Sequence, residues 1–188
     1  AEALKVAIIR DRDFFLFLSQ HAGSLRQGDP ELLAAMVERS ARIHLDHIRG
    51  GGDPFELGGS RPLDFGHWSA HYLESRSGYT LRHGEAVAIG IALDTCYAAR
   101  LGLLSREERD AVLEILARAG LKVWHPLLSR REPDGSLAVG QGLEEFREHL
   151  GGRLAVTLPQ GLGNRKEVDR IDLGVVAEEA DFLARIPP

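Results

Sequence analysis

Apolar residues recur at helical spacing along most of this chain, and turn-forming residues separate the resulting segments. In the first segment Leu4, Ile8, Phe14 and Leu18 follow this spacing, which the polar run 11–13 interrupts. Asp-Pro at residues 29–30 is a typical helix start, and Ser at position 105 is a typical N-cap. The pattern predicts helices over residues 1–21, 30–49, 67–76, 83–101, 105–120 and 175–186.

The pattern changes after Gly120. Residues 126–142 are rich in turn formers, with Pro-Asp-Gly at 133–135, and residues 142–150 fit a short polar helix or a turn. Residues 154–158 read as a strand, and a second strand near residues 167–171 would complete a hairpin. We therefore expect a mainly α fold, a single helical domain over residues 1–188 with a small β-hairpin.

Composition excludes several classes of protein. A formal charge of −5 and an isoelectric point near 5.9 argue against a nucleic-acid-binding surface. No apolar run approaches the roughly 20 residues of a membrane span, and we expect no signal peptide. The single cysteine, Cys96, excludes an internal disulfide framework and suits a reducing cytoplasm. Because Cys96 lies in an apolar helix, we expect it to be a buried structural thiol. The helical pattern runs from the first residue without a cap, so we expect a piece of a longer protein.

Three of the eight histidines lie between residues 63 and 90. His67 and His71 are four apart, so on a helix both rings point the same way, and a turn could return His83 to them. This spacing favours a metal site, with Gly66 and Gly84 allowing close backbone approach. A pair of helices held by buried, hydrogen-bonded imidazoles is the alternative. Spacing leaves the third ligand open, as either His71 or one of several carboxylates, namely Glu2, Asp46, Asp64, Glu74 and Glu85.

Longer motifs narrow these possibilities. The segments LDFGHWSAHYLE (from residue 63) and HGEAVAIGIALD (from residue 83) resemble the LNxGHTxGHAxE and HGEAVAxG motifs of 3-dehydroquinate synthases and related sugar-phosphate cyclases. The opening AEALK, followed by Asp-Phe-Phe at 13–15, is similar to that family's AExxK segment. The resemblance covers nearly the whole chain. It implies the C-terminal helical domain of that fold, with the N-terminal NAD-binding domain absent from this chain.

The resemblance also implies a chemistry and residues that carry it. Glu2, His67 and His83 match the ligands of Zn²⁺ or Co²⁺. His71 matches a residue that contacts substrate and moves protons, and Lys5 matches a catalytic, substrate-binding lysine. Enzymes of this kind use NAD⁺ to oxidise one carbon of a seven-carbon sugar phosphate transiently, eliminate phosphate and close a carbocycle. The resemblance implies a cytoplasmic, homodimeric parent lyase of the shikimate pathway of aromatic amino acid biosynthesis, acting on a small sugar phosphate.

Four positions depart from the motif of dehydroquinate synthases. Asp64 replaces the usual Asn, Arg61 lies one residue nearer the motif than the usual arginine, and HLDHI at 44–48 replaces a segment with lysine. Downstream, Phe-Arg-Glu-His at 146–149 replaces Asp-Lys-Lys. We expect the substrate contacts to come from Lys5, Arg61, Asp64, His71, Arg147 and His149.

These departures leave the substrate open. The lost lysines would pair with a substrate carboxylate, so the parent enzyme could act on a neutral ketose phosphate of the sedoheptulose 7-phosphate type. Alternatively, Arg147 and His149 replace the lysines and the substrate is still a sugar acid, because Arg binds carboxylates at least as well as Lys. As an isolated fragment, the chain could be a catalytically inactive helical module that binds a metal.

Overall fold

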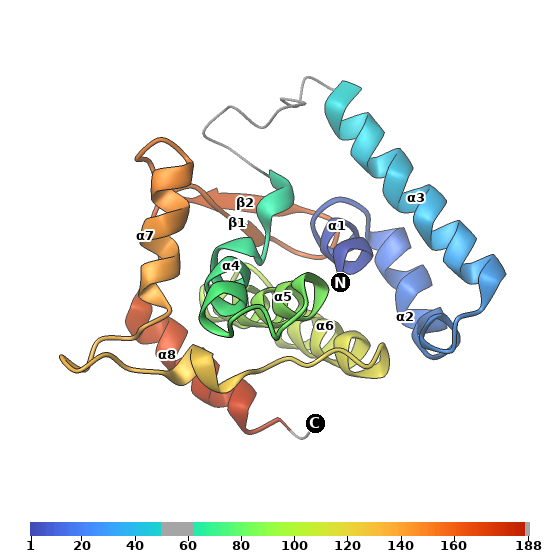
Figure 1. Cartoon of the computed structure of the whole chain (residues 1–188). Coiled ribbons are helices and arrows are strands. Elements are labelled where there is room, and N and C mark those ends of the chain that lie inside the picture. Colours follow the sequence, from blue (N-terminus) through green and yellow to red (C-terminus); the bar gives the residue numbers. More distant parts are fainter. Residues whose placement is uncertain (50–61, 187–188) are drawn as a thin grey trace.

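The computed structural model of this protein describes residues 1–49 and 62–186, and the expected mainly α fold with a small β-hairpin is confirmed. Helix α5 runs through the middle of the molecule, with the other elements arranged around it (Figure 1). The α-helices are α1 (Glu2–Arg10), α2 (Arg12–Arg26), α3 (Pro30–Arg49), α4 (His67–Arg76), α5 (His83–Arg100), α6 (Arg106–Arg118), α7 (Gly140–His149) and α8 (Leu173–Ala184). Two short 3₁₀ helices, η1 (Pro62–Asp64) and η2 (Pro126–Ser129), and two antiparallel strands, β1 (Val156–Pro159) and β2 (Arg165–Val168), complete the fold.

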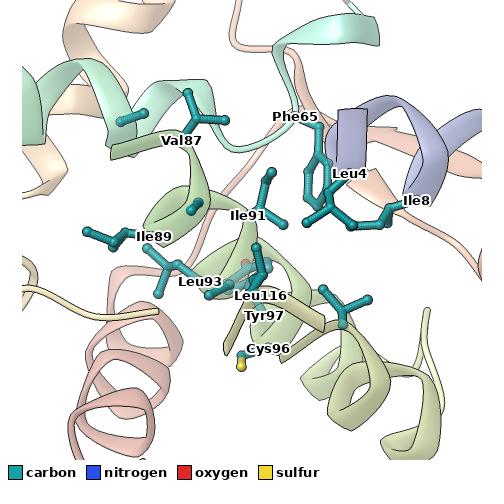
Figure 2. Packing of buried hydrophobic residues seen from close by; sticks show 14 of the residues in the cluster. Leu4, Ile8, Phe65, Val87, Ile89, Ile91, Leu93, Cys96, Tyr97 and Leu116 are labelled. Atoms are coloured by element: carbon teal, nitrogen blue, oxygen red, sulfur yellow. The ribbon is translucent and has the colours of Figure 1, made fainter. Parts of the chain in front are cut away.

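The core forms around α5 because this helix is apolar on all sides. Its residues 86–98 are all buried, which is the behaviour of a central helix rather than an amphipathic surface helix. Figure 2 shows Ile91 of α5 beside Leu4 of α1, with Phe65 nearby and Leu116 of α6 further along the helix. Cys96 is 1% exposed, which confirms the expected buried thiol.

The expected first helix is two helices. Asp11 has an extended backbone (φ −152°, ψ 96°), and its side chain accepts a hydrogen bond from the Phe14 amide at 2.9 Å, so it caps α2. Arg39 of α3 also donates to both carboxylate oxygens of Asp11. The polar run at 11–13 therefore ends one helix and begins the next, and α2 continues to Arg26, beyond the predicted end.

Several predicted boundaries in the second half of the chain are shifted by two residues or more. Gly142 was expected to begin a helix or turn, but it lies inside α7, where a Cβ would come within 2.8 Å of the Trp68 carbonyl oxygen in α4. Close packing of two helices therefore explains this glycine. The hairpin is held against the helical core by the Gly163 amide, which donates to the Ile8 carbonyl at 2.7 Å. Within the described residues, no helix combines the length and apolar character of a membrane span.

Candidate metal and substrate site

Three potential metal ligands from distant parts of the chain meet at one point. Glu2, His67 and His83 are the first residues of α1, α4 and α5, and each offers one donor atom within 4.8 Å of the other two. The Nε2 atoms of His67 and His83 lie 3.8 and 3.5 Å from Oε1 of Glu2. His71 lies close by, with its ring centroid 5.6 Å from that of His67, but it is not a member of this group. The structure thus brings together the three residues that the family resemblance implied.

Hydrogen bonds orient both imidazoles toward Glu2. Nδ1 of His67 lies 3.1 Å from the Phe65 carbonyl oxygen, and Nδ1 of His83 lies 3.2 Å from the Glu74 carboxylate. Because these oxygens accept and do not donate, a proton on Nδ1 of each ring satisfies them and leaves the Nε2 lone pair free for a cation shared with Glu2. Metal-binding histidines are usually held in this way by an acceptor behind the ring.

Glu74 is the carboxylate whose position sequence reasoning missed. It was one of several possible metal ligands by spacing, but it lies behind His83, and its Oε2 is also 3.3 Å from Nδ1 of His71. Its position on α4, three residues after His71, is consistent with the second contact. The contact between Glu74 and His83 depends on the turn between α4 and α5, and the spacing of the two residues along the chain does not reveal it.

Close backbone packing places His67 at the start of α4. Gly66 has φ +79°, and a Cβ there would lie 2.8 Å from the Ile91 amide nitrogen of α5. A Cβ on Gly90 would lie 2.0 Å from the Gly66 carbonyl oxygen. The expectation for Gly66 is confirmed, whereas that for Gly84 is wrong, because nothing lies within 4 Å of a Cβ at that position. Gly90 makes the close approach instead.

A buried carboxylate lies beneath this turn. Asp94 of α5 is 1% exposed, and it accepts hydrogen bonds from the Gly66 amide at 3.0 Å and the Trp68 indole nitrogen at 2.8 Å. Burial raises the pKa of Asp94 to about 7, although the two hydrogen bonds favour the charged form. The sequence did contain a signal for this residue, since Asp94 is the one charged residue in the apolar run 86–98.

Electrostatics keep the ligands in forms suitable for binding a cation. Burial, together with the nearby Lys5 ammonium, lowers the pKa of His67 to about 4, so its imidazole is neutral at pH 7. Burial alone would raise the pKa of Glu2, but Lys5, with Nζ at 2.7 Å, and the two histidines lower it overall. A neutral imidazole and an ionised carboxylate are the forms that coordinate a metal ion.

Two hollows flank the three ligands, and Asp64 borders both. One is a pocket of ≈ 340 Å³ between α4 and α7, and the other lies between α1 and α3 and includes Glu2 and Lys5. The residues that line the pocket are Asp64, Trp68, His71, Glu74, Ser75, Tyr79, Gly142, Glu145, Phe146 and His149. A molecule in the second hollow would therefore contact Glu2 directly, and one in the pocket would contact His71 and Glu74, which lie beside the two histidine ligands.

The other expected substrate contacts are divided by the structure. His149 lines the pocket with His71 and Asp64, but Arg147 forms an ion pair with Glu144 at 2.7 Å and does not line it. Arg61 lies outside the described residues. In the segment 44–48, His44 lines the second hollow. His47 is buried, with Nδ1 3.2 Å from a guanidinium nitrogen of Arg10.

Comparison with known proteins identifies the family of this chain. A family model described as 3-dehydroquinate synthase C-terminal matches residues 1–138. A 3-dehydroquinate synthase of Pseudomonas aeruginosa (strain LESB58) is 35% identical over 172 residues, covering 87% of this chain and 43% of that protein. A 2-epi-5-epi-valiolone synthase of Streptomyces glaucescens is 32% identical over 189 residues, covering 98% of this chain and 47% of that protein.

A solved structure is similar over almost the whole chain. It is the 2-epi-5-epi-valiolone synthase ValA from Streptomyces hygroscopicus subsp. jinggangensis 5008, with NAD⁺ and Zn²⁺ bound. The two chains have a TM-score of 0.85 and 29% sequence identity, over 97% of this chain and 49% of ValA. The chain thus spans about half the length of the relatives it matches.

Proposed function

Because this chain belongs to the 3-dehydroquinate synthase C-terminal family, we propose that it is the metal-binding and substrate-binding part of a sugar-phosphate cyclase that depends on NAD⁺ and a divalent metal. This membership confirms the family that the sequence motifs indicated. The proposed reaction is elimination of phosphate from a seven-carbon sugar phosphate, followed by closure of a carbocycle. The NAD⁺-binding part would be supplied by the rest of a longer protein.

The convergence of Glu2, His67 and His83 carries this proposal. Two imidazole nitrogens and one carboxylate oxygen are a donor set typical of catalytic zinc sites, which keep a further position for water or substrate. The acceptors behind both rings are the support that such a site needs. When bound, Zn²⁺ would supply Lewis acidity and NAD⁺ the reversible oxidation.

The residues around the ligands have distinct proposed roles. His71 is 59% exposed at its side chain and lines the pocket, and its Nδ1 faces Glu74, so Nε2 is available to exchange a proton with substrate. Lys5 is buried beside Glu2 and lines the second hollow, where its charge would offset that of the phosphate group. Asp64 and His149 would contact the sugar from opposite walls of the pocket.

The charge of the pocket favours a neutral sugar as substrate. Three of its described lining residues, Asp64, Glu74 and Glu145, are carboxylates, and none is Lys or Arg. Arg147, which would have replaced a lost lysine, is paired with Glu144 instead. A substrate carboxylate would meet like charges in this pocket, whereas the hydroxyl groups of a ketose phosphate could donate hydrogen bonds to them. A ketose phosphate of the sedoheptulose 7-phosphate type is therefore the favoured substrate, and a sugar acid is the second candidate.

Release of inorganic phosphate tests both parts of the proposal. The intact protein, supplied with NAD⁺ and Zn²⁺, is assayed with sedoheptulose 7-phosphate and, separately, with a seven-carbon phosphorylated sugar acid. We expect phosphate release from the ketose, loss of release with a chelator, and loss in His67→Ala. Turnover of the acid alone would reject the neutral substrate. Equal zinc content of wild type and His67→Ala would reject the metal site.

One substitution tests the role of Asp64 in choosing the substrate. Asp64→Asn removes one negative charge from the pocket at nearly constant volume. We expect the KM for the sugar acid to fall, because repulsion of its carboxylate decreases, while the KM for the ketose does not fall. An unchanged KM for the acid would place the discrimination elsewhere. If the chain is assayed alone, and it binds zinc but releases no phosphate, this result would support the alternative of a catalytically inactive metal-binding module.

A further inference from the structure

We propose that Asp94 is a positioning residue that preorganises the metal centre by holding the turn that carries His67. This inference rests on the proposed metal site. It concerns a residue four positions beyond the HGEAVAxG motif, on the buried side of α5, that neither lines the pocket nor belongs to the group of candidate metal ligands.

The geometry that supports this role is a pair of hydrogen bonds on either side of His67. Oδ2 of Asp94 accepts from the amide of Gly66, the residue before His67, at 3.0 Å. Oδ1 accepts from the indole nitrogen of Trp68, the residue after it, at 2.8 Å. One side chain thus fixes both neighbours of a ligand, while the Phe65 carbonyl oxygen fixes its ring. A ligand whose two neighbours are fixed by hydrogen bonds is held more accurately than one positioned only by the first turn of its helix.

The location of Asp94 indicates that its carboxylate has a specific role there. Its neighbours Ile91, Leu93 and Cys96 are buried hydrophobic residues, and Figure 2 shows them packed in the core around α5. A buried ionisable side chain in such a position costs free energy, and an apolar residue of similar size is often tolerated better. The two donors explain the exception, because without Asp94 the Gly66 amide and the Trp68 indole would both be buried without an acceptor.

The same carboxylate links the metal centre to the pocket. Trp68 lines the pocket that contains His71 and His149, and the residue is 1% exposed. The bond from its indole nitrogen to Asp94 therefore fixes a wall of the substrate pocket, and the bond from Gly66 fixes the backbone of a metal ligand. These two effects can be separated by substitution, since only one of the donors is a side chain.

The experiment measures Zn²⁺ affinity by competition with a chromophoric chelator, using the purified protein and three variants. In Asp94→Asn one oxygen becomes an NH₂ group, which faces a donor, so we expect affinity to fall by about tenfold or more. Trp68→Phe keeps the Gly66 bond and should change affinity by less than about threefold. In the double variant Trp68→Phe/Asp94→Asn, the amide can turn its oxygen to Gly66. Affinity should therefore return to within about threefold of wild type, which a merely destabilising change would not produce.

Controls separate positioning from loss of stability and from failure of the proposed site. Leu183→Ala removes buried atoms from α8, and it should lower the melting temperature of the metal-free protein without changing zinc affinity. Equal losses of affinity in Leu183→Ala and Asp94→Asn would overturn the inference, as would wild-type affinity in Asp94→Asn. If wild type and His67→Ala bind zinc equally, the metal site itself fails, which is a distinguishable result.

A second variant keeps the test decisive if Asp94→Asn does not fold. Trp68→Phe/Asp94→Leu removes the indole donor and replaces the carboxylate with a side chain of similar shape, so only the Gly66 amide loses its partner. We expect the same tenfold or larger loss of zinc affinity, relative to Trp68→Phe. Equal affinities in these two variants would overturn the inference.

Discussion

Two glycines of α5 should respond in opposite ways to substitution by alanine. Alanine is favoured over glycine inside a helix by about 0.5–1 kcal/mol, so propensity alone predicts that both Gly84→Ala and Gly90→Ala stabilise the protein. A Cβ at Gly84, the second residue of α5, would have no atom within 4 Å, so this substitution should be neutral or stabilise by up to that gain. A Cβ at Gly90 would lie 2.0 Å from the Gly66 carbonyl oxygen and 2.9 Å from Oγ of Ser69.

The expected cost at Gly90 follows from that contact. Non-bonded atoms prefer separations of about 3.5 Å, so α4 and α5 would have to move apart by more than about 1 Å. Overpacking of this kind costs about 1–3 kcal/mol, and moving Gly66 also weakens its bond to the Asp94 carboxylate, worth about 1.5–3 kcal/mol. After subtracting the gain in helix propensity, Gly90→Ala should lower the free energy of unfolding by about 2–5 kcal/mol.

Urea unfolding of the metal-free protein, followed by circular dichroism in the presence of a chelator, measures both effects. A shift of the midpoint with an unchanged m-value would report stability alone. If Gly90→Ala is as stable as wild type or more so, the close approach of α4 and α5 is refuted. If Gly84→Ala is destabilised as strongly as Gly90→Ala, the loss has another cause than this contact, and the argument fails in the same way.

Other predictions concern the ligands and a helix cap. Glu74→Gln should weaken zinc binding by about tenfold or more, because it removes the charged acceptor behind His83; unchanged affinity in a chelator competition would contradict this. In the metal-free protein, burial lowers the pKa of His67 from 6.5 to about 4, so the unfolded state takes up a proton first as the pH falls. The free energy of unfolding of wild type, relative to His67→Gln, should therefore decrease by about 3 kcal/mol between pH 6.5 and 4, and a flat difference in urea titrations would refute this. Ser105→Ala should cost about 1 kcal/mol in thermal unfolding, because it removes the bond from the Glu108 amide that caps α6, and no change would show that the cap contributes nothing.

Local chemistry made much of the helical fold predictable. Asp29 and Ser105 mark helix starts through hydrogen bonds that need only neighbouring residues, and the structure shows both caps. The apolar run 86–98 also predicted a buried helix, because a segment of this composition has no polar face to expose to water. Boundaries that depend on a distant partner were placed less well. Gly142 was mistaken for the start of a helix or turn. A glycine is needed there because α7 packs closely against α4, and this contact cannot be seen in the local sequence.

The candidate site shows the same limit. The helical spacing of His67 and His71 was visible in the sequence, but spacing could not choose Glu2 over other carboxylates, and only the family resemblance did so. Asp94 and Glu74 act across helix packing, through partners 26 and 9 residues away, and no local pattern reveals such contacts. Arg147 illustrates the converse: the resemblance implied a substrate contact, which stays a prediction, and its side chain pairs with Glu144 on the same helix.

Each of the three candidate metal ligands is the first residue of a helix, and this has a consequence for the lifetime of the protein. The first turn of a helix frays most easily, because its amide groups lack partners within the helix. An ion held by Glu2, His67 and His83 would therefore crosslink the first turns of three helices. Binding to the folded state alone adds to the free energy of unfolding by mass action. Without such an ion the folded protein would open more often to proteases, so its lifetime would depend on the supply of the metal that it binds.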